Sequence, residues 1–166
     1  MAGKPIPVEQ ILEMLAKAPG DIAAAAEGDP PELLCTSPGP GEWSARDVLA
    51  HMRSCADVWG GCIRQILQEE RPVIRAVDPR TWARSTNYLE LDFETSLREY
   101  TAQRRELLDL LRSLPPDAWQ READVVGAGK PLVRTVHFYA QWLAKHERPH
   151  LKQIRRVIKT LRGGVA

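Results

Sequence analysis

The sequence predicts an all-α protein, a four-helix bundle in which a long crossover joins the second and third helices. Three observations favour this fold class. Four segments repeat apolar residues at steps of three and four, the period of an amphipathic helix. No run alternates apolar and polar residues long enough, between turn signals, to indicate a half-buried strand. The connection after the second helical segment is long, so an up-down-down-up arrangement of the helices is allowed.

Length and composition indicate one ordinary globular domain over residues 1–166. The formal net charge of +1 argues against binding to nucleic acid or to a membrane surface. A run of basic residues near the C-terminal end lacks the interleaved aromatics of a nucleic-acid site. No signal-peptide core or membrane-spanning apolar run is visible, and three cysteines without metal-finger spacing suggest reduced thiols. We therefore expect a cytoplasmic protein.

The first helix is expected over residues 8–18, and its inner face is formed by Ile11, Leu12, Met14 and Leu15. Pro19 and the following glycine should interrupt it, and a short alanine-rich helical turn should follow. Residues 28–40 are rich in proline and glycine, which predicts a loop. A strap over the end of the bundle is the favoured interpretation of this loop, and a lid is the alternative.

The second helix is expected to begin at Ser44, because Ser44 and Asp47 have the spacing of a capping box. Its apolar stripe includes His51 and Cys55, and Pro72 ends the helical region. Residues 71–91 are then predicted to form an irregular crossover, in which Trp82 plugs one end of the bundle.

The third helix should start near Asp92 and stop at the proline pair 115–116. Its inner stripe contains Arg104, whose buried guanidinium would need a carboxylate or a bound anion. Residues 120–131 are predicted to be a second connector. Its GAGKP segment is too short and wrongly placed for a phosphate-binding loop.

The last helix, expected over residues 135–161, carries the strongest functional signal. His146 and His150 interrupt its apolar stripe and lie four residues apart, so both rings can point at one metal ion. A buried polar ring needs a partner, and a metal would satisfy both rings at once. Pro149 lies between them and should bend the helix at this point.

His51 can supply a third ligand if the second and fourth helices are neighbours. Three imidazoles match zinc, nickel or iron(II), and three protein ligands leave a position open, as catalytic metal sites do. The alternative is three core histidines bonded to backbone carbonyls or side chains. We expect His51, His146 and His150 to be the metal ligands.

Cys55, Arg104 and Gln153 are candidates for supporting roles near this stripe. Cys55 follows His51 by one turn and could approach the metal. The favoured interpretation is that Cys55 is a small buried side chain of the core. Arg104 could clamp an anionic substrate group, although pairing with an acidic neighbour is favoured. Gln153 could orient a metal ligand or a water molecule by a hydrogen bond, without contacting the metal itself. Glu147 should point off the ligand face, and His137 lies about half-way round the helix from His146, so it is not expected to bind metal.

With these residues in view, the sequence resembles the DinB/YfiT-like superfamily of metal-binding four-helix bundles. The matching pieces are PGPGEWSARDVLAHM around His51, REYTAQRRELLDLL in the third helix, and HERPHLKQI around His146 and His150. The resemblance covers residues 33–161. It implies a divalent metal, most often nickel or zinc and otherwise iron or manganese, held by those three histidines. It also implies that homodimers are common.

Two functions follow as hypotheses. In the first, suggested by the resemblance, the metal activates a low-molecular-weight thiol for transfer to an electrophile, or water for hydrolysis of a small-molecule substrate. In the second, the bundle is not catalytic. The histidines or their metal then hold helices together, or the protein binds a partner.

Overall fold

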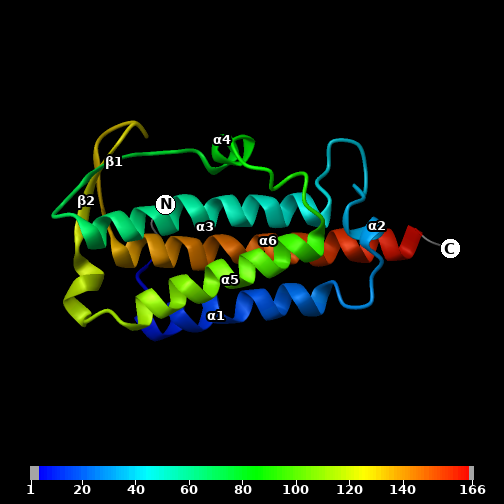
Figure 1. The fold of residues 1–166 in the computed structure, drawn as a ribbon, viewed down its shortest axis with the longest axis horizontal. Coiled ribbons are helices and arrows are strands. Elements are labelled where there is room, and N and C mark those ends of the chain that lie inside the picture. The colour runs from blue at the N-terminus through cyan, green and yellow to red at the C-terminus, as the bar shows by residue number, and fades with distance from the viewer. Residues whose placement is uncertain (1–3, 165–166) are drawn as a thin grey trace.

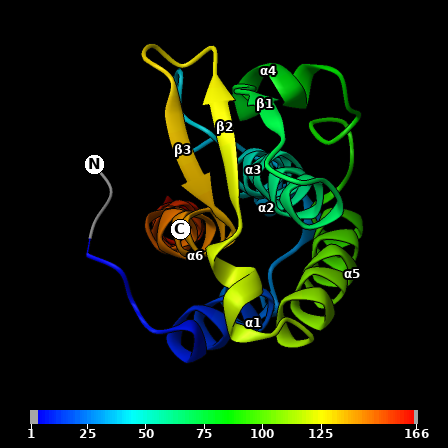
Figure 2. The ribbon, with the colours of Figure 1, turned by 90° about the vertical axis from the view of Figure 1, so that its left-hand side faces the viewer.

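The computed structural model describes residues 4–164, and four long helices form a bundle within them (Figure 1). These are α1 (Val8–Ala25), α3 (Ala45–Gln68), α5 (Phe93–Arg112) and α6 (Val136–Gly164). Seen end-on, each helix packs against two others in the cyclic order α1, α5, α3, α6 (Figure 2). No helix of the described residues is both long and apolar enough to cross a membrane.

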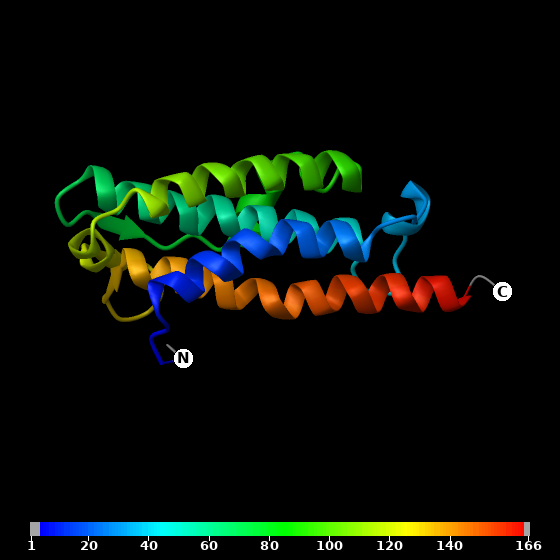
Figure 3. The ribbon, with the colours of Figure 1, turned by 90° about the horizontal axis from the view of Figure 1, so that it is seen from below.

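The long crossover sets the directions of the helices. It returns from the end of α3 to the level of its start, so α3 and α5 run the same way while α1 and α6 run the opposite way (Figures 1 and 3). This is the up-down-down-up order that the long connection allows, and the predicted all-α four-helix bundle is confirmed. The apolar stripes of the four helices meet in two buried clusters along the bundle axis.

The predicted starts of α3 and α5 are confirmed by their caps. The hydroxyl of Ser44 accepts a hydrogen bond from the backbone N–H of Asp47 at 3.1 Å, and the carboxylate of Asp47 accepts one from the N–H of Ser44 at 3.1 Å. Asp92 accepts from the N–H of Thr95 at 2.8 Å. These side chains satisfy amides that have no partner within the helix, and the cap at Ser44 sets where His51 falls on α3.

The predicted interruption at Pro19 is wrong, because α1 continues through it to Ala25. Proline has no N–H, so the carbonyl of Leu15 loses its usual donor four residues later. The guanidinium of Arg104 replaces that donor, with Nη1 3.0 Å from the oxygen of Leu15. A contact from α5 therefore stabilises the irregular turn of α1.

The expectation of no strands is also wrong in detail, because a small sheet lies at one end of the bundle (Figures 1 and 2). β1 (Val73–Arg75) pairs parallel with β2 (Glu122–Val126), and β2 pairs antiparallel with β3 (Leu132–Thr135). The predicted connector at 120–131 thus contains β2 and the hairpin turn that joins it to β3. Its glycines, Gly127 and Gly129, both adopt positive φ.

Two connections contain short helices. The loop at 28–40 contains α2 (Pro31–Leu34), which buries Leu34 in the core cluster at that end of the bundle. The crossover contains α4 (Pro79–Arg84), which lies along α3 (Figure 1). The 3-10 helix η1 (Pro116–Gln120) follows α5 and buries Trp119.

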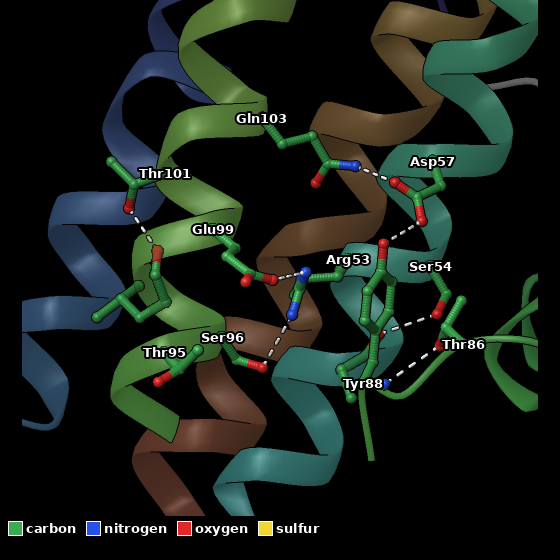
Figure 4. A network of polar contacts seen from close by, with 12 residues as sticks. Arg53, Ser54, Asp57, Thr86, Tyr88, Thr95, Ser96, Glu99, Thr101 and Gln103 are labelled. Carbon is green, nitrogen blue, oxygen red and sulfur yellow. Dashed lines mark hydrogen bonds and ion pairs between the residues drawn. The ribbon is translucent and has the colours of Figure 1, made fainter. Parts of the chain in front are cut away.

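Trp82 does not plug the bundle end as predicted, because its side chain lies 41% exposed on α4. Its Nε1 donates to the carboxylate of Asp57 on α3 at 2.9 Å. Asp57 also accepts from the hydroxyl of Tyr88 at 2.6 Å and from the amide of Gln103 on α5 (Figure 4). One carboxylate therefore fastens the crossover to two helices of the bundle.

Arg53 forms the second half of this polar network (Figure 4). It is buried, and it donates from Nη1 to the hydroxyl of Ser96 at 3.1 Å and from Nη2 to the carboxylate of Glu99. Its guanidinium carbon lies 3.7 Å from the centre of the Tyr88 ring, which covers it from the crossover side. The crossover thus covers one side of α3, and α5 and α6 pack against other sides of the same helix.

Candidate metal centre

The structure brings His51, His146 and His150 together between α3 and α6, which are neighbours. The ring centres of His51 and His146 lie 5.4 Å apart, those of His51 and His150 lie 4.8 Å apart, and those of His146 and His150 lie 4.5 Å apart. The Nε2 atoms of His146 and His150 face each other at 3.3 Å. The i,i+4 spacing on α6 and the register of α3 thus place the three imidazole rings next to one another.

Two of the rings are held neutral by their surroundings. The pKa of His51 is lowered to about 4, mainly by burial and also by His150 and Arg80, while Asp78 acts in the opposite direction. Burial also lowers the pKa of His146 to about 4, with His150 and His51 adding to the effect. Near neutral pH both rings therefore carry a free nitrogen lone pair, the form that binds a metal.

Gln153 orients the ring of His150, as its position one turn later suggests. Its amide oxygen lies 3.0 Å from Nδ1 of His150, so that nitrogen donates a proton and Nε2 keeps its lone pair toward His146. Nδ1 of His146 is buried and has no hydrogen-bond partner among the described residues. The two histidines of α6 are therefore held unequally.

Cys55 lies closer to the cluster than the sequence suggests. Its buried sulfur is 3.5 Å from Nε2 of His51. One donor atom from each of His51, Cys55 and His146 fits within 4.8 Å of the other two. Burial raises the pKa of the Cys55 thiol to about 12, and the charge of Glu147 adds to the rise.

A pocket of about 610 Å³ opens beside the three rings. Trp59 packs edge-on against His146, with ring centres 4.9 Å apart. The ring centre of Trp43 lies 5.3 Å from that of His51. Trp142 extends the aromatic wall. Asp78 and Arg80, at the start of α4, bring polar groups to the pocket, as do Glu42 and Arg156. The crossover therefore supplies one wall of the site.

Sequence reasoning did not assign these wall residues to the site, although part of the signal was present. Trp142 lies one helical turn before His146, and Trp59 lies one turn after Cys55, so both fall on the ligand face of their helices. Asp78 and Arg80 belong to an irregular segment whose position no periodicity predicts.

Arg104 lies outside this pocket, in the centre of the bundle. Its guanidinium donates to both carboxylate oxygens of Glu147, and Nη1 lies 2.9 Å from Oε2. The hydroxyl of Tyr100 donates to the same carboxylate at 2.8 Å. Burial would lower the pKa of Arg104, but Glu147 and Tyr100 together raise it above its ordinary value. Arg104 therefore pairs with an acidic neighbour, as the sequence favours, and none of these contacts reaches the pocket.

His137 and Pro149 are the remaining residues of α6 with an expected role. Nε2 of His137 donates to the carbonyl of Ile6 at 2.9 Å, far along the helix from the cluster. Pro149 lies within α6, which continues through it.

The residues present fit a divalent cation. Two nitrogen donors at about 2.0–2.1 Å from a tetrahedral zinc ion are about 3.3–3.4 Å apart, and the facing Nε2 atoms of His146 and His150 have this spacing. The donors are neutral imidazoles, which suit zinc, nickel, copper and iron. The pocket beside them leaves room for a further ligand that is not part of the protein.

Comparisons with known proteins agree with this architecture. A candidate metal-dependent hydrolase of Oceanobacillus iheyensis is 30% identical over 128 residues, which is 74% of this chain and 71% of that protein. A second candidate metal-dependent hydrolase, from Bacillus licheniformis, is 28% identical over 153 residues, which is 90% of this chain and 85% of the relative.

A solved structure shares the fold. It is YfiT from Bacillus subtilis, described as having an unusual four-helix bundle topology and as a candidate metal-dependent hydrolase. It superimposes with a TM-score of 0.80 over 98% of this chain and 93% of that chain, at 20% sequence identity. The family model of the DinB superfamily matches residues 14–154, which include all three histidines. The chain therefore belongs to the DinB superfamily.

Proposed function

We propose that this protein binds one divalent metal ion through His51, His146 and His150 and is an enzyme that activates water or a low-molecular-weight thiol toward a small-molecule substrate. The observation that carries the proposal is the convergence of three imidazoles at the wall of an open pocket. The names of the two curated relatives, both candidate metal-dependent hydrolases, support it.

A divalent cation held by three imidazoles supplies a Lewis acid that lowers the pKa of a bound water or thiol. The pocket of about 610 Å³ falls within the usual range of about 300–1,000 Å³ for small-molecule sites. Trp43, Trp59 and Trp142 offer apolar surface to an organic substrate, and Arg80 and Arg156 offer cationic donors. The arrangement suits a substrate with an apolar body and a polar or anionic group.

Glu147 is unsuited to accept a proton in this reaction, although it is adjacent to His146 in the sequence. Its carboxylate already binds Arg104 and Tyr100 inside the bundle. The carboxylates that line the pocket are Glu42 and Asp78. A proton acceptor from this chain would come from these two residues, and Asp78 also acts on the electrostatic environment of His51.

Metal content tests the binding part of the proposal. Elemental analysis of the purified protein, or of the protein reconstituted with zinc or nickel, should give close to one divalent ion per chain. His51→Ala should reduce this content strongly. His137→Ala is the matched control, because His137 lies outside the cluster and binds Ile6. No uptake by the unaltered protein would remove the proposal.

Turnover separates the enzyme from a bundle that uses the metal only for structure. Metal-loaded protein should accelerate either hydrolysis of model esters and amides, or addition of small thiols to model electrophiles. His51→Ala should abolish this rate with a modest loss of stability if the site is catalytic. If the histidines are structural, the same substitution should lower stability and change no reaction.

Three further expectations stay predictions. The resemblance favours a homodimer, which light scattering on the purified protein tests directly. Nickel or zinc is expected in preference to iron or manganese, which elemental analysis of protein from unsupplemented cells tests. Cytoplasmic localisation is expected from the composition, and cell fractionation tests it.

A further inference from the structure

We propose that Cys55 is a fourth protein ligand of the cation at this centre, so that the donor set is three imidazole nitrogens and one thiolate sulfur. The proposal rests on the proposed function, since it concerns the same cation. It adds a ligand beyond the three histidines and narrows the class of metal that the site selects.

Geometry provides the first argument. A zinc–sulfur bond of about 2.3 Å and a zinc–nitrogen bond of about 2.0–2.1 Å at a tetrahedral angle place the two donors about 3.5–3.6 Å apart. The sulfur of Cys55 lies 3.5 Å from Nε2 of His51. The spacing between the Nε2 atoms of His146 and His150, 3.3 Å, is that expected of two nitrogens on one ion. Two separate pairs of donors thus already have metal-ligand spacing.

The surroundings of the sulfur provide the second argument. Cys55 is fully buried, yet it lines the same pocket as the three histidines. One donor atom each from His51, Cys55 and His146 lies within 4.8 Å of the others. The sulfur is one helical turn after His51, so the same turn of α3 delivers both donors. The sulfur therefore faces a ring nitrogen of His51 at the wall of the pocket.

Binding through sulfur has a defined chemical balance. The thiol releases its proton to solvent, and the sulfur donates an electron pair to the cation, with no change in oxidation state. A thiolate favours zinc and other borderline or soft ions over manganese or magnesium. Because zinc can expand to five ligands during a reaction, four protein donors still allow a substrate atom to bind from the pocket.

X-ray absorption spectroscopy of the zinc-loaded protein tests the proposal directly. The unaltered protein should show one sulfur neighbour at about 2.3 Å beside nitrogen neighbours at about 2.0–2.1 Å. Cobalt-loaded protein should show a sulfur-to-cobalt charge-transfer band in the near ultraviolet. Cys55→Ser should lose both signals and bind zinc at least about 10-fold more weakly, since even loss of an outer partner of a ligand costs about 10–100-fold.

Cys62→Ser is the matched control. Cys62 lies two turns further along α3, is half-buried, and interacts with Tyr139 rather than with the histidines. This variant should keep the sulfur neighbour and the band. Loss of the signals in Cys62→Ser, or their persistence in Cys55→Ser, would overturn the assignment.

The unaltered protein distinguishes the two proposals without any variant. Zinc bound with only nitrogen and oxygen neighbours would overturn the role of Cys55 and leave the three-histidine site standing. Failure to bind any divalent ion would overturn both.

Discussion

The guanidinium of Arg104 and the carboxylate of Glu147 form an ion pair in the centre of the bundle, with only 2% and 3% of these residues exposed. They come from α5 and α6, which are not adjacent in the ring of helices. Glu147 lies between His146 and His150 in the sequence. The pair therefore holds, from inside, the turn of α6 that presents both rings to the pocket.

Breaking this pair should strongly destabilise the protein. Glu147→Gln leaves the Arg104 charge without its carboxylate in a buried position, which typically costs about 3–5 kcal/mol. Urea denaturation measures the loss. Glu106→Gln, on the exposed face of α5, is the control and should change stability by less than about 0.5 kcal/mol. A similar small change for Glu147→Gln would show that water or another group replaces the carboxylate.

The stability of the metal-free protein should fall as the pH drops from about 6.5 to about 4. In the folded chain the pKa of His51 and of His146 is lowered to about 4, mainly by burial. In the unfolded chain both rings titrate near about 6.5, so within this window the unfolded state binds more protons. The contribution of the two neutral rings to the free energy of unfolding is therefore fully present above about pH 6.5, and it is lost as the pH falls to about 4.

Urea midpoints of chelator-treated protein across this pH range measure the effect. The dependence on pH should become weaker in His51→Gln, because one of the two shifted groups is then removed. An equal dependence in both proteins would mean that other groups control the acid sensitivity.

Asp57→Ala should loosen the crossover that forms one wall of the pocket. The substitution removes the acceptor of Trp82 and Tyr88, and hydrogen bonds to a charged group contribute about 1.5–3 kcal/mol. Amide hydrogen exchange in residues 76–91 should become faster, while α1 and α6 stay protected. Asp109→Ala, at an exposed position of α5, should leave the pattern unchanged. Uniformly faster exchange would indicate global destabilisation instead.

Ser44→Ala should cost about 1 kcal/mol, within the range of about 0.5–2 kcal/mol for loss of an N-cap. The substitution leaves the N–H of Asp47 without its acceptor at the buried start of α3. Ser113→Ala, at the exposed C-terminal end of α5, is the comparison and should cost less. Thermal or urea unfolding of the two variants side by side checks the difference. Equal losses would mean that the cap at Ser44 adds nothing.

Much of this fold could be predicted because the helices follow local rules. The caps at Ser44 and Asp92 and the apolar period are properties of short segments, and the structure contains both. The histidines could be singled out for the same reason, since imidazoles in an apolar stripe conflict with the pattern around them. Their convergence additionally requires α3 and α6 to be neighbours, which the period alone does not specify.

The missed features depend on contacts between distant segments. β1 has three residues, too few for an alternation to be visible, and it pairs with a strand about fifty residues later. The continuity of α1 at Pro19 depends on a donor from Arg104 on another helix. Asp78 and Arg80 reach the pocket only because Asp57 fastens the crossover to α3. No local pattern contains this information.

The position of the pocket between α3 and α6 offers a way to find its ligands without knowing the reaction. Its walls come from α3 and the loop before it, from the crossover, and from α6, so the cavity exists only when these segments are packed together. By mass action, a compound at 100 times its dissociation constant would add about 2.7 kcal/mol to the free energy of unfolding. A small-molecule library can therefore be screened for compounds that raise the melting temperature of the protein. The chemical features that these compounds share would indicate the class of the substrate.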